Sequence, residues 1–319
     1  MEFVFLAVLH NLMLESKKHK GIKLFDGARL SNGEEAIADI IRSALFTHVA
    51  GSHSIGEFHD RTYAIVRGSF PDIPDSSEMD RLGSKCAFYF LRQMQWFVNS
   101  LWEHHDSNIY VRDGFLLVYK KDIEDGFSYK ASLSEVFSKA TLEGGGTLFS
   151  DEQIHCTAKA IVYSGVDEIL CDGIDYKSPV DNTFRKKKET DRISRAYYFI
   201  MFARKSYIFP MKIVFYITAF ECLFSTTTSE LTHRIAERVA LAVRSVETNT
   251  ISTYQMMKRA YKVRSAIVHG SPIGEKESEQ RDISLFLDRI ARILLRSPDE
   301  LFSRSDEDID AYFIDLLLK

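Results

Sequence analysis

The chain has 319 residues, of which 45% are hydrophobic and 27% are charged. This length exceeds the usual size of one domain and the apolar fraction is ample for packed cores, so we expect a soluble protein of two domains. The four cysteines, Cys86, Cys156, Cys171 and Cys222, are scattered without a C-x2-C pair, which argues against a zinc site or a disulfide framework and favours thiols in a reducing cytoplasm.

The formal net charge of −4 is unevenly distributed along the chain. Residues 1–184 hold 18 basic and 27 acidic side chains, residues 185–292 hold 20 and 11, and residues 293–319 hold 3 and 7. The net positive charge of residues 185–292 would attract a polyanion such as RNA. The competing interpretation is a solvated surface, because Arg185–Lys188 resembles a linker run and Lys258, Arg259 and Lys262 suit an ordinary exposed helix face.

The apolar start of the chain, MEFVFLAVLHNLML, raises the question of a signal peptide. It lacks a basic n-region, carries Glu2 and is interrupted by His10 and Asn11, so a buried strand or helix is predicted instead. The second apolar region, residues 197–224, contains four charged residues and a proline, which favours a pair of core helices over a membrane span. We therefore predict a cytoplasmic protein with no membrane partner.

The first half of the chain mixes helix and strand signals. Ser31 suits the cap of a helix to about Phe46, residues 62–67 alternate as a strand, and a second helix is predicted over residues 84–103. Asp113–Gly114 between two apolar runs predicts a hairpin turn within residues 108–120. Three glycines, Gly144–Gly146, then suggest a linker, since no Lys-Ser/Thr pair follows as in a phosphate-binding loop.

The second half has almost only helical periodicity. Segments are expected near residues 151–163, 190–206, 211–224, 230–246, 252–268, 275–296 and 306–318. Packing of several such amphipathic segments predicts an antiparallel bundle. The predicted fold class is α+β, with a mixed domain over residues 1–150 and an all-α helical bundle over residues 151–319.

An arginine and a histidine five positions apart stand at the end of one of these helical segments. In YKVRSAIVHG, residues 261–270, Arg264 offers a fixed cation and His269 a side chain of the type that titrates near neutral pH. Gly270 and Pro272 end the helix in a common way, so His269 is expected at its C-terminus. This pairing suits phosphodiester chemistry without a metal.

Three pieces of the C-terminal half, in this order, resemble an Apea-like HEPN domain, a helical bundle of prokaryotic defence and toxin ribonucleases. They are YITAFECLF (Tyr216–Phe224), ELTHRIAERVALAV (Glu230–Val243) and YKVRSAIVHG. The resemblance covers about residues 190–297. It implies that Arg264 and His269 are the catalytic R-x4-6-H pair and that two copies form a homodimer with their motifs facing each other. Ser265 stands where other branches often have Asn, Asp or His.

The chemistry that the resemblance implies needs neither metal nor cofactor, because RNA carries its own nucleophile in the 2′-hydroxyl group. His269 would move the proton, and Arg264 would bind the non-bridging phosphate oxygens. The products would be a 2′,3′-cyclic phosphate and a 5′-hydroxyl, and DNA would not be cut. The expected function is a metal-independent endoribonuclease, a hydrolase-type nuclease of toxin or antiviral defence systems; the alternative is a non-catalytic HEPN module for RNA binding or dimerisation.

Other residues are weaker candidates for the site. Ser265, Glu221, His233 and Arg238 are candidate supporting residues. Glu221 also suits a role as the partner of a bundle arginine, and His233 and Arg238 favour packing or a dimer surface.

Two acidic clusters and the N-terminal region complete the candidates. Residues 103–106, EHHD, resemble a metal site but suit a solvated helix end better, and Asp172, Asp175 and Lys177 lack the strand pattern of a metal-dependent nuclease. Residues 1–150 are expected to act as a sensor, a regulatory region or a substrate selector, and an antitoxin or another regulatory partner is a further expectation.

Overall fold

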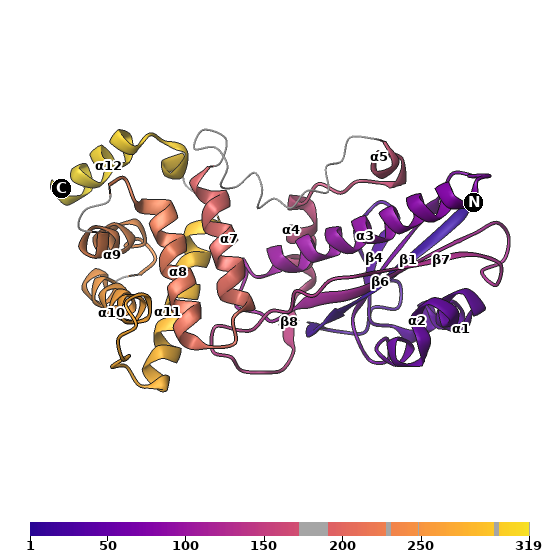
Figure 1. Ribbon diagram of the computed structural model, residues 1–319, viewed down its shortest axis with the longest axis horizontal. Helices are drawn as coiled ribbons and strands as arrows, with labels where there is room; N and C mark the ends of the chain where they lie inside the picture. Colours follow the sequence, from indigo (N-terminus) through magenta and orange to yellow (C-terminus); the bar gives the residue numbers. More distant parts are fainter. Residues whose placement is uncertain (172–190, 228–230, 248, 297–299, 319) are drawn as a thin grey trace. The chain divides into compact units, whose positions relative to one another are not determined.

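The protein is described by a computed structural model that covers residues 1–171, 191–227, 231–247, 249–296 and 300–318 (Figure 1). These residues form two compact units: residues 1–102, 107–137 and 145–171 make the first, and residues 103–106, 138–144 and those from 191 onward make the second. The first unit is a sheet with helices and the second is helical, so the predicted α+β class is confirmed. The run Arg185–Lys188 and the candidates Asp172, Asp175 and Lys177 lie outside the described residues.

A six-stranded antiparallel sheet is the framework of the first unit. Its strand order is β3 (Ile22–Phe25), β4 (Ala28–Ser31), β5 (Tyr63–Ser69), β1 (Glu2–His10), β6 (Tyr110–Tyr119) and β7 (Gly126–Ser132). The apolar start of the chain is thus a buried strand, as predicted. Successive side chains of a strand point to opposite faces, and both faces of β1 are covered, which explains its continuous apolar run.

Helices cover both faces of this sheet. Phe3, Phe5 and Ala7 pack in one core with α3 (Ser76–Leu101), α4 (Asp151–Ala160) and α5 (Val166–Leu170). Val4 and Leu6 pack in the other with α1 (Ala38–Arg42) and α2 (Ala44–Gly56), which follow η1 (Glu34–Ala36). A separate parallel pair joins β2 (Leu12–Leu14) to β8 (Thr147–Phe149).

The predicted hairpin turn at Asp113–Gly114 is wrong. Strand β6 continues through both residues, and the chain reverses only between β6 and β7. Gly114 pairs with Ala7 on one side and Ala131 on the other, and a Cβ atom there would come within 2.7 Å of the Phe5 ring. The glycine therefore makes room for a core aromatic ring rather than for a turn.

Two further predictions differ from the structure. Ser31 ends β4 instead of capping a helix, because its hydroxyl oxygen accepts hydrogen bonds from the Gly33 amide at 3.1 Å and the Tyr63 hydroxyl at 3.2 Å. The division at residue 150 also differs, since α4 and α5 belong to the first unit. Burial of Ile154 and Ile169 against α3 holds these two helices there.

Six helices make up the described part of the second unit. They are α7 (Arg192–Lys205), α8 (Phe209–Phe224), α9 (Leu231–Ala242), α10 (Thr250–Val268), α11 (Glu277–Arg296) and α12 (Asp306–Leu318), with the short η2 (Glu300–Ser303) before α12. Helix α8 is the central one, because it packs against α7, α9, α10 and α11. Pro210 lies in its first turn, where its missing amide costs no hydrogen bond.

The motif EHHD at residues 103–106 contributes to packing in the second unit. The carboxylate of Glu103 accepts a hydrogen bond from the Tyr197 hydroxyl at 2.6 Å, and Asp106 accepts one from the Ala140 amide at 2.8 Å. Within the described ranges, no group of three His, Cys, Asp or Glu side chains could hold a metal ion. No helix in the same ranges has the length and apolarity to cross a bilayer.

Candidate active site

The C-terminal end of α10 positions the two motif residues. The Asn249 side chain caps the start of this helix by accepting a hydrogen bond from the Ser252 amide at 2.9 Å. At the other end the Gly270 amide donates to Ile267 O and the Ser271 amide to Ala266 O, at 3.2 and 2.8 Å. These two hydrogen bonds, with Gly270 at φ +68°, form a Schellman motif, so the helix ends at His269, as predicted.

Five of the six predicted site residues surround one open pocket of about 670 Å³. The pocket is formed by side chains of α8, α9 and α10. Its lining residues are Glu221, Thr232, His233, Tyr261, Arg264, Ser265 and His269. Five positions along a regular helix correspond to a rotation of about 140°, which would direct the two side chains to different sides. Arg264 and His269 nevertheless line the same pocket, because the helix ends at His269 and its side chain does not follow the helical rotation.

Arg264 is already paired in this pocket. Its Nη2 atom lies 3.2 Å from Oε2 of Glu221, and the two side chains are 30% and 16% exposed. Burial raises the pKa of Glu221, and the positive charge of Arg264 only partly offsets this effect. A phosphate that binds Arg264 would therefore compete with a half-desolvated carboxylate.

Several buried polar atoms of the pocket wall lack a partner. Arg264 Nε, Glu221 Oε1 and the Tyr261 hydroxyl make no hydrogen bond with any described residue. The Tyr261 hydroxyl is near enough for its pKa to be raised, chiefly by burial and further by the charge of Glu221, yet no hydrogen bond of normal geometry joins the two. An unsatisfied buried polar atom costs about 1–3 kcal/mol, and such atoms gather at sites that bind something.

The two histidines of the pocket are on its solvent side. Both His233 and His269 are exposed, and the His233 ring packs edge-on against Tyr254 with 5.7 Å between centroids. Nδ1 of His233 also lies 4.0 Å from a carboxylate oxygen of Glu237 one turn along α9. The pocket therefore offers two accessible imidazoles beside one arginine, a combination able to move protons around a bound phosphate.

A second hollow of about 690 Å³ adjoins the first and shares Thr232, Tyr261, Ser265 and His269 with it. Lys258 and Lys262 extend its wall along one face of α10, at helical spacing from Ser265 and His269. Lys262 pairs with Glu275 at 3.2 Å, whereas Lys258 lies over the Tyr254 ring, with its Nζ 5.6 Å from the centroid, and forms no ion pair with a described residue. Exposed basic side chains thus extend along α10 from the R-x4-H motif, and acidic side chains neutralise some of them.

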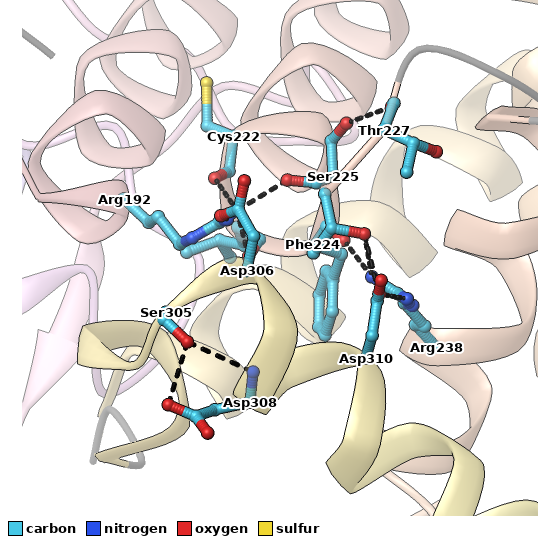
Figure 2. Close-up of polar contacts among 12 residues, drawn as sticks. Arg192, Cys222, Phe224, Ser225, Thr227, Arg238, Ser305, Asp306, Asp308 and Asp310 are labelled. Atoms are coloured by element: carbon cyan, nitrogen blue, oxygen red, sulfur yellow. Dashed lines mark hydrogen bonds and ion pairs between the residues drawn. The ribbon is translucent and has the colours of Figure 1, made fainter.

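Arg238, the sixth predicted residue, lies away from the pocket and is only 4% exposed. It donates hydrogen bonds to Phe224 O at 2.7 Å and Thr226 Oγ1 at 3.1 Å, and it forms an ion pair with Asp310 of α12 (Figure 2). Arg192 of α7 acts in the same way, binding carbonyl oxygens at the end of α8 and pairing with Asp306. These contacts give Arg238 the packing role that its sequence position favours over a place at the site.

Sequence reasoning missed Tyr261 and Thr232. Tyr261 precedes Arg264 by three positions on α10, the spacing at which helical side chains are neighbours, so its place beside the arginine was available from the spacing alone. Thr232 comes from another helix, and nothing in its local sequence marks it. Its contribution depends on how α9 packs against α10.

Comparison with known proteins gives no relative. No model of a protein family, no curated protein and no solved structure matches the chain. The groups in the pocket therefore carry the functional interpretation: one arginine held by a carboxylate, two exposed imidazoles, two hydroxyls of Ser265 and Thr232, and a neighbouring basic face.

Proposed function

We propose that the protein is a metal-independent endoribonuclease of the HEPN type, which cleaves RNA by attack of the 2′-hydroxyl group on the adjacent phosphate. The observation that carries this proposal is that Arg264 and His269 line one pocket, where His233 supplies a second imidazole. A basic helix face that leads away from the pocket suits the phosphates of a polyanion.

The roles follow from the side-chain types. The imidazole of His269 removes the 2′-hydroxyl proton, and His233 offers a second imidazole to protonate the departing 5′-oxygen. The guanidinium of Arg264 binds the non-bridging oxygens, where its planar fork matches two of them at once. Glu221 holds that fork in place before RNA binds, and Ser265 adds a hydroxyl at the rim.

Several parts of this proposal rest on the resemblance of the motif. They are a homodimer in which two pockets face each other, a toxin or antiviral defence role, a cytoplasmic location, and a regulatory partner or antitoxin that keeps the enzyme silent. The unpaired polar atoms of the pocket are consistent with a site that is completed only when RNA binds.

The test is incubation of purified protein with total cellular RNA in EDTA, followed by mapping of the new ends. Wild type should produce 2′,3′-cyclic phosphate ends, His269→Ala should produce none, and His155→Ala should match wild type because this exposed histidine belongs to α4 of the first unit. Single-stranded DNA of the same sequence should stay intact. Equal cleavage by wild type and His269→Ala would remove His269 from the mechanism.

The second candidate function is a non-catalytic module that binds RNA. It is favoured by one observation, the ion pair in which Glu221 already engages Arg264. Under this alternative, wild type would bind RNA but leave it uncut in the same assay, and His269→Ala would bind RNA as tightly as wild type.

A further inference from the structure

The first unit has a pocket of its own, with a volume of about 530 Å³. Four aromatic rings line it, with Phe3 and Phe90 buried at its base and Phe25 and Tyr163 half-buried. The rings of Phe25 and Tyr163 stack with 4.0 Å between centroids, and those of Phe3 and Phe90 with 5.4 Å. A Cβ atom at Gly68 of β5 would come within 2.8 Å of the Phe3 ring, so this glycine makes room for Phe3, and the half-buried rings of Phe25 and Tyr163 are the aromatic surface that a ligand can reach.

One buried polar group of this pocket has no hydrogen-bond partner among the described residues. The hydroxyl of Tyr163 is buried and makes no hydrogen bond with any described residue. Burial raises the pKa of Tyr163, so the group stays a neutral phenol that can donate or accept one hydrogen bond. Leaving a buried hydroxyl unpaired costs free energy that a ligand with a matching polar atom would recover.

The charges around the pocket are negative. Asp26 and Asp167 both line it; Asp26 pairs with Lys23 at 2.6 Å, whereas Asp167 forms no ion pair with a described residue. Arg67 also lines the pocket, but it alternates on β5 with Val66 and Gly68, so its side chain is directed to the opposite face of the sheet. Among the described residues that line it, the pocket therefore offers the carboxylate of Asp167, whereas the one cation, Arg67, is directed away from it.

We propose that this pocket binds an organic cation that carries a flat aromatic ring. The ring packs against the half-buried edge of the stacked Phe25–Tyr163 pair, the ammonium group pairs with Asp167, and a polar atom of the ring satisfies the Tyr163 hydroxyl. The proposal is independent of the ribonuclease proposal, because every residue in it belongs to the first unit. It gives the N-terminal region a ligand-binding role.

Calorimetric titration of the full-length protein with tryptamine tests this site. Indole-3-acetate is the matched ligand, with the same ring and the opposite charge. Tryptamine should bind saturably and at least tenfold more tightly than indole-3-acetate. Asp167→Asn should weaken tryptamine binding about threefold to tenfold, whereas Asp39→Asn should leave it unchanged, since Asp39 is an exposed aspartate in the first turn of the equally short α1 on the other face of the sheet.

Tyr163→Phe separates a binding role from a structural one. Removing an unpaired hydroxyl should leave the melting temperature of the ligand-free protein the same or higher, while the affinity for tryptamine falls about threefold to tenfold. A fall in melting temperature with unchanged affinity would assign the hydroxyl to the fold and overturn its role. The absence of saturable tryptamine binding, or equal binding of both indoles, would overturn the proposed site.

Discussion

Nη2 of Arg264 lies 3.2 Å from Oε2 of Glu221, so the arginine of the R-x4-H motif is held by a carboxylate before any substrate arrives. The pair joins α10 to α8. Burial makes the negative charge of Glu221 unfavourable and so raises the pKa of this residue. An incoming phosphate meets a guanidinium that is only partly satisfied, because Arg264 Nε has no hydrogen-bond partner among the described residues.

Replacing Glu221 with glutamine should tighten RNA binding about threefold to tenfold. The amide keeps the shape of the side chain but removes the negative charge that competes with phosphate for Arg264. The measurement is the affinity for an RNA whose 2′-hydroxyls are methylated, which prevents cleavage. Weaker binding by Glu221→Gln would show instead that holding Arg264 in place needs the negative charge of Glu221, beyond the shape and the acceptor oxygen that glutamine keeps.

Arg264→Lys should lower the cleavage rate about 100-fold while the fold is kept. Lysine preserves the charge but loses the planar fork that binds two phosphate oxygens. Arg289→Lys is the matched control, since Arg289 of α11 also pairs with a carboxylate, that of Glu247 at 2.9 Å, and lines neither hollow. Circular dichroism checks the folding of both variants, and near-normal cleavage by Arg264→Lys would contradict the role given to the fork.

Lys258→Ala should reduce the salt dependence of RNA binding more than Lys262→Ala does. Each phosphate contact on a single strand contributes about 0.7 to the slope of log K against log salt. Lys258 forms no ion pair with a described residue, whereas Lys262 is paired with Glu275. Binding titrations at several salt concentrations measure the slopes, and an equal or larger effect at Lys262 would contradict this order.

Asp310→Asn should destabilise the protein by about 2–4 kcal/mol, because it leaves the buried guanidinium of Arg238 without its charged partner. Burial opposes ionisation of Asp310, but the bonds from Thr226 and Arg238 hold its pKa below the usual value. The stabilisation is therefore present above the ordinary pKa of an aspartate and is lost as the pH falls through the lowered one. Urea unfolding measures the change, with the exposed Asp282→Asn as a control that should shift the free energy by less than about 0.5 kcal/mol.

Asp106 should make the stability of the protein fall as the pH rises from about 4 to about 7. Burial and the nearby charge of Asp288 raise the pKa of Asp106 to about 7. The folded state then binds a proton that the unfolded state has released, so the favourable contribution is complete below the ordinary pKa and is lost as the pH approaches the raised one.

Asp106→Asn tests this directly, because the amide oxygen can still accept the hydrogen bond from the Ala140 amide. The free energy of unfolding of wild type should drop relative to the variant between pH 4.5 and pH 7 in urea titrations. Lys212, whose pKa burial lowers to about 8, is not expected to add a slope over that range. Parallel curves for the two proteins would contradict the raised pKa of Asp106.

Local sequence signals were most successful where neighbouring residues decide the outcome. The helices of the second half, Pro210 at the start of α8 and the end of α10 at Gly270 all follow from periodicity and capping, which act within a few residues. The errors have the opposite origin. Gly114 has the sequence context of a turn residue, but the Phe5 ring of β1 packs against it within a strand. Ser31 has the context of a helix cap, but its hydroxyl oxygen accepts a hydrogen bond from Tyr63 of β5.

The same contrast applies to the site. The place of Arg264 and His269 at a helix end follows from one segment and its glycine, so it can be predicted from local sequence. The meeting of Glu221 and His233 with them in one pocket depends on how the helices pack, and so does the pairing of Arg238, five positions after His233 on α9, with Asp310 of α12. Burial of apolar side chains sets how α8, α9 and α10 pack, and that packing depends on residues far apart in the chain.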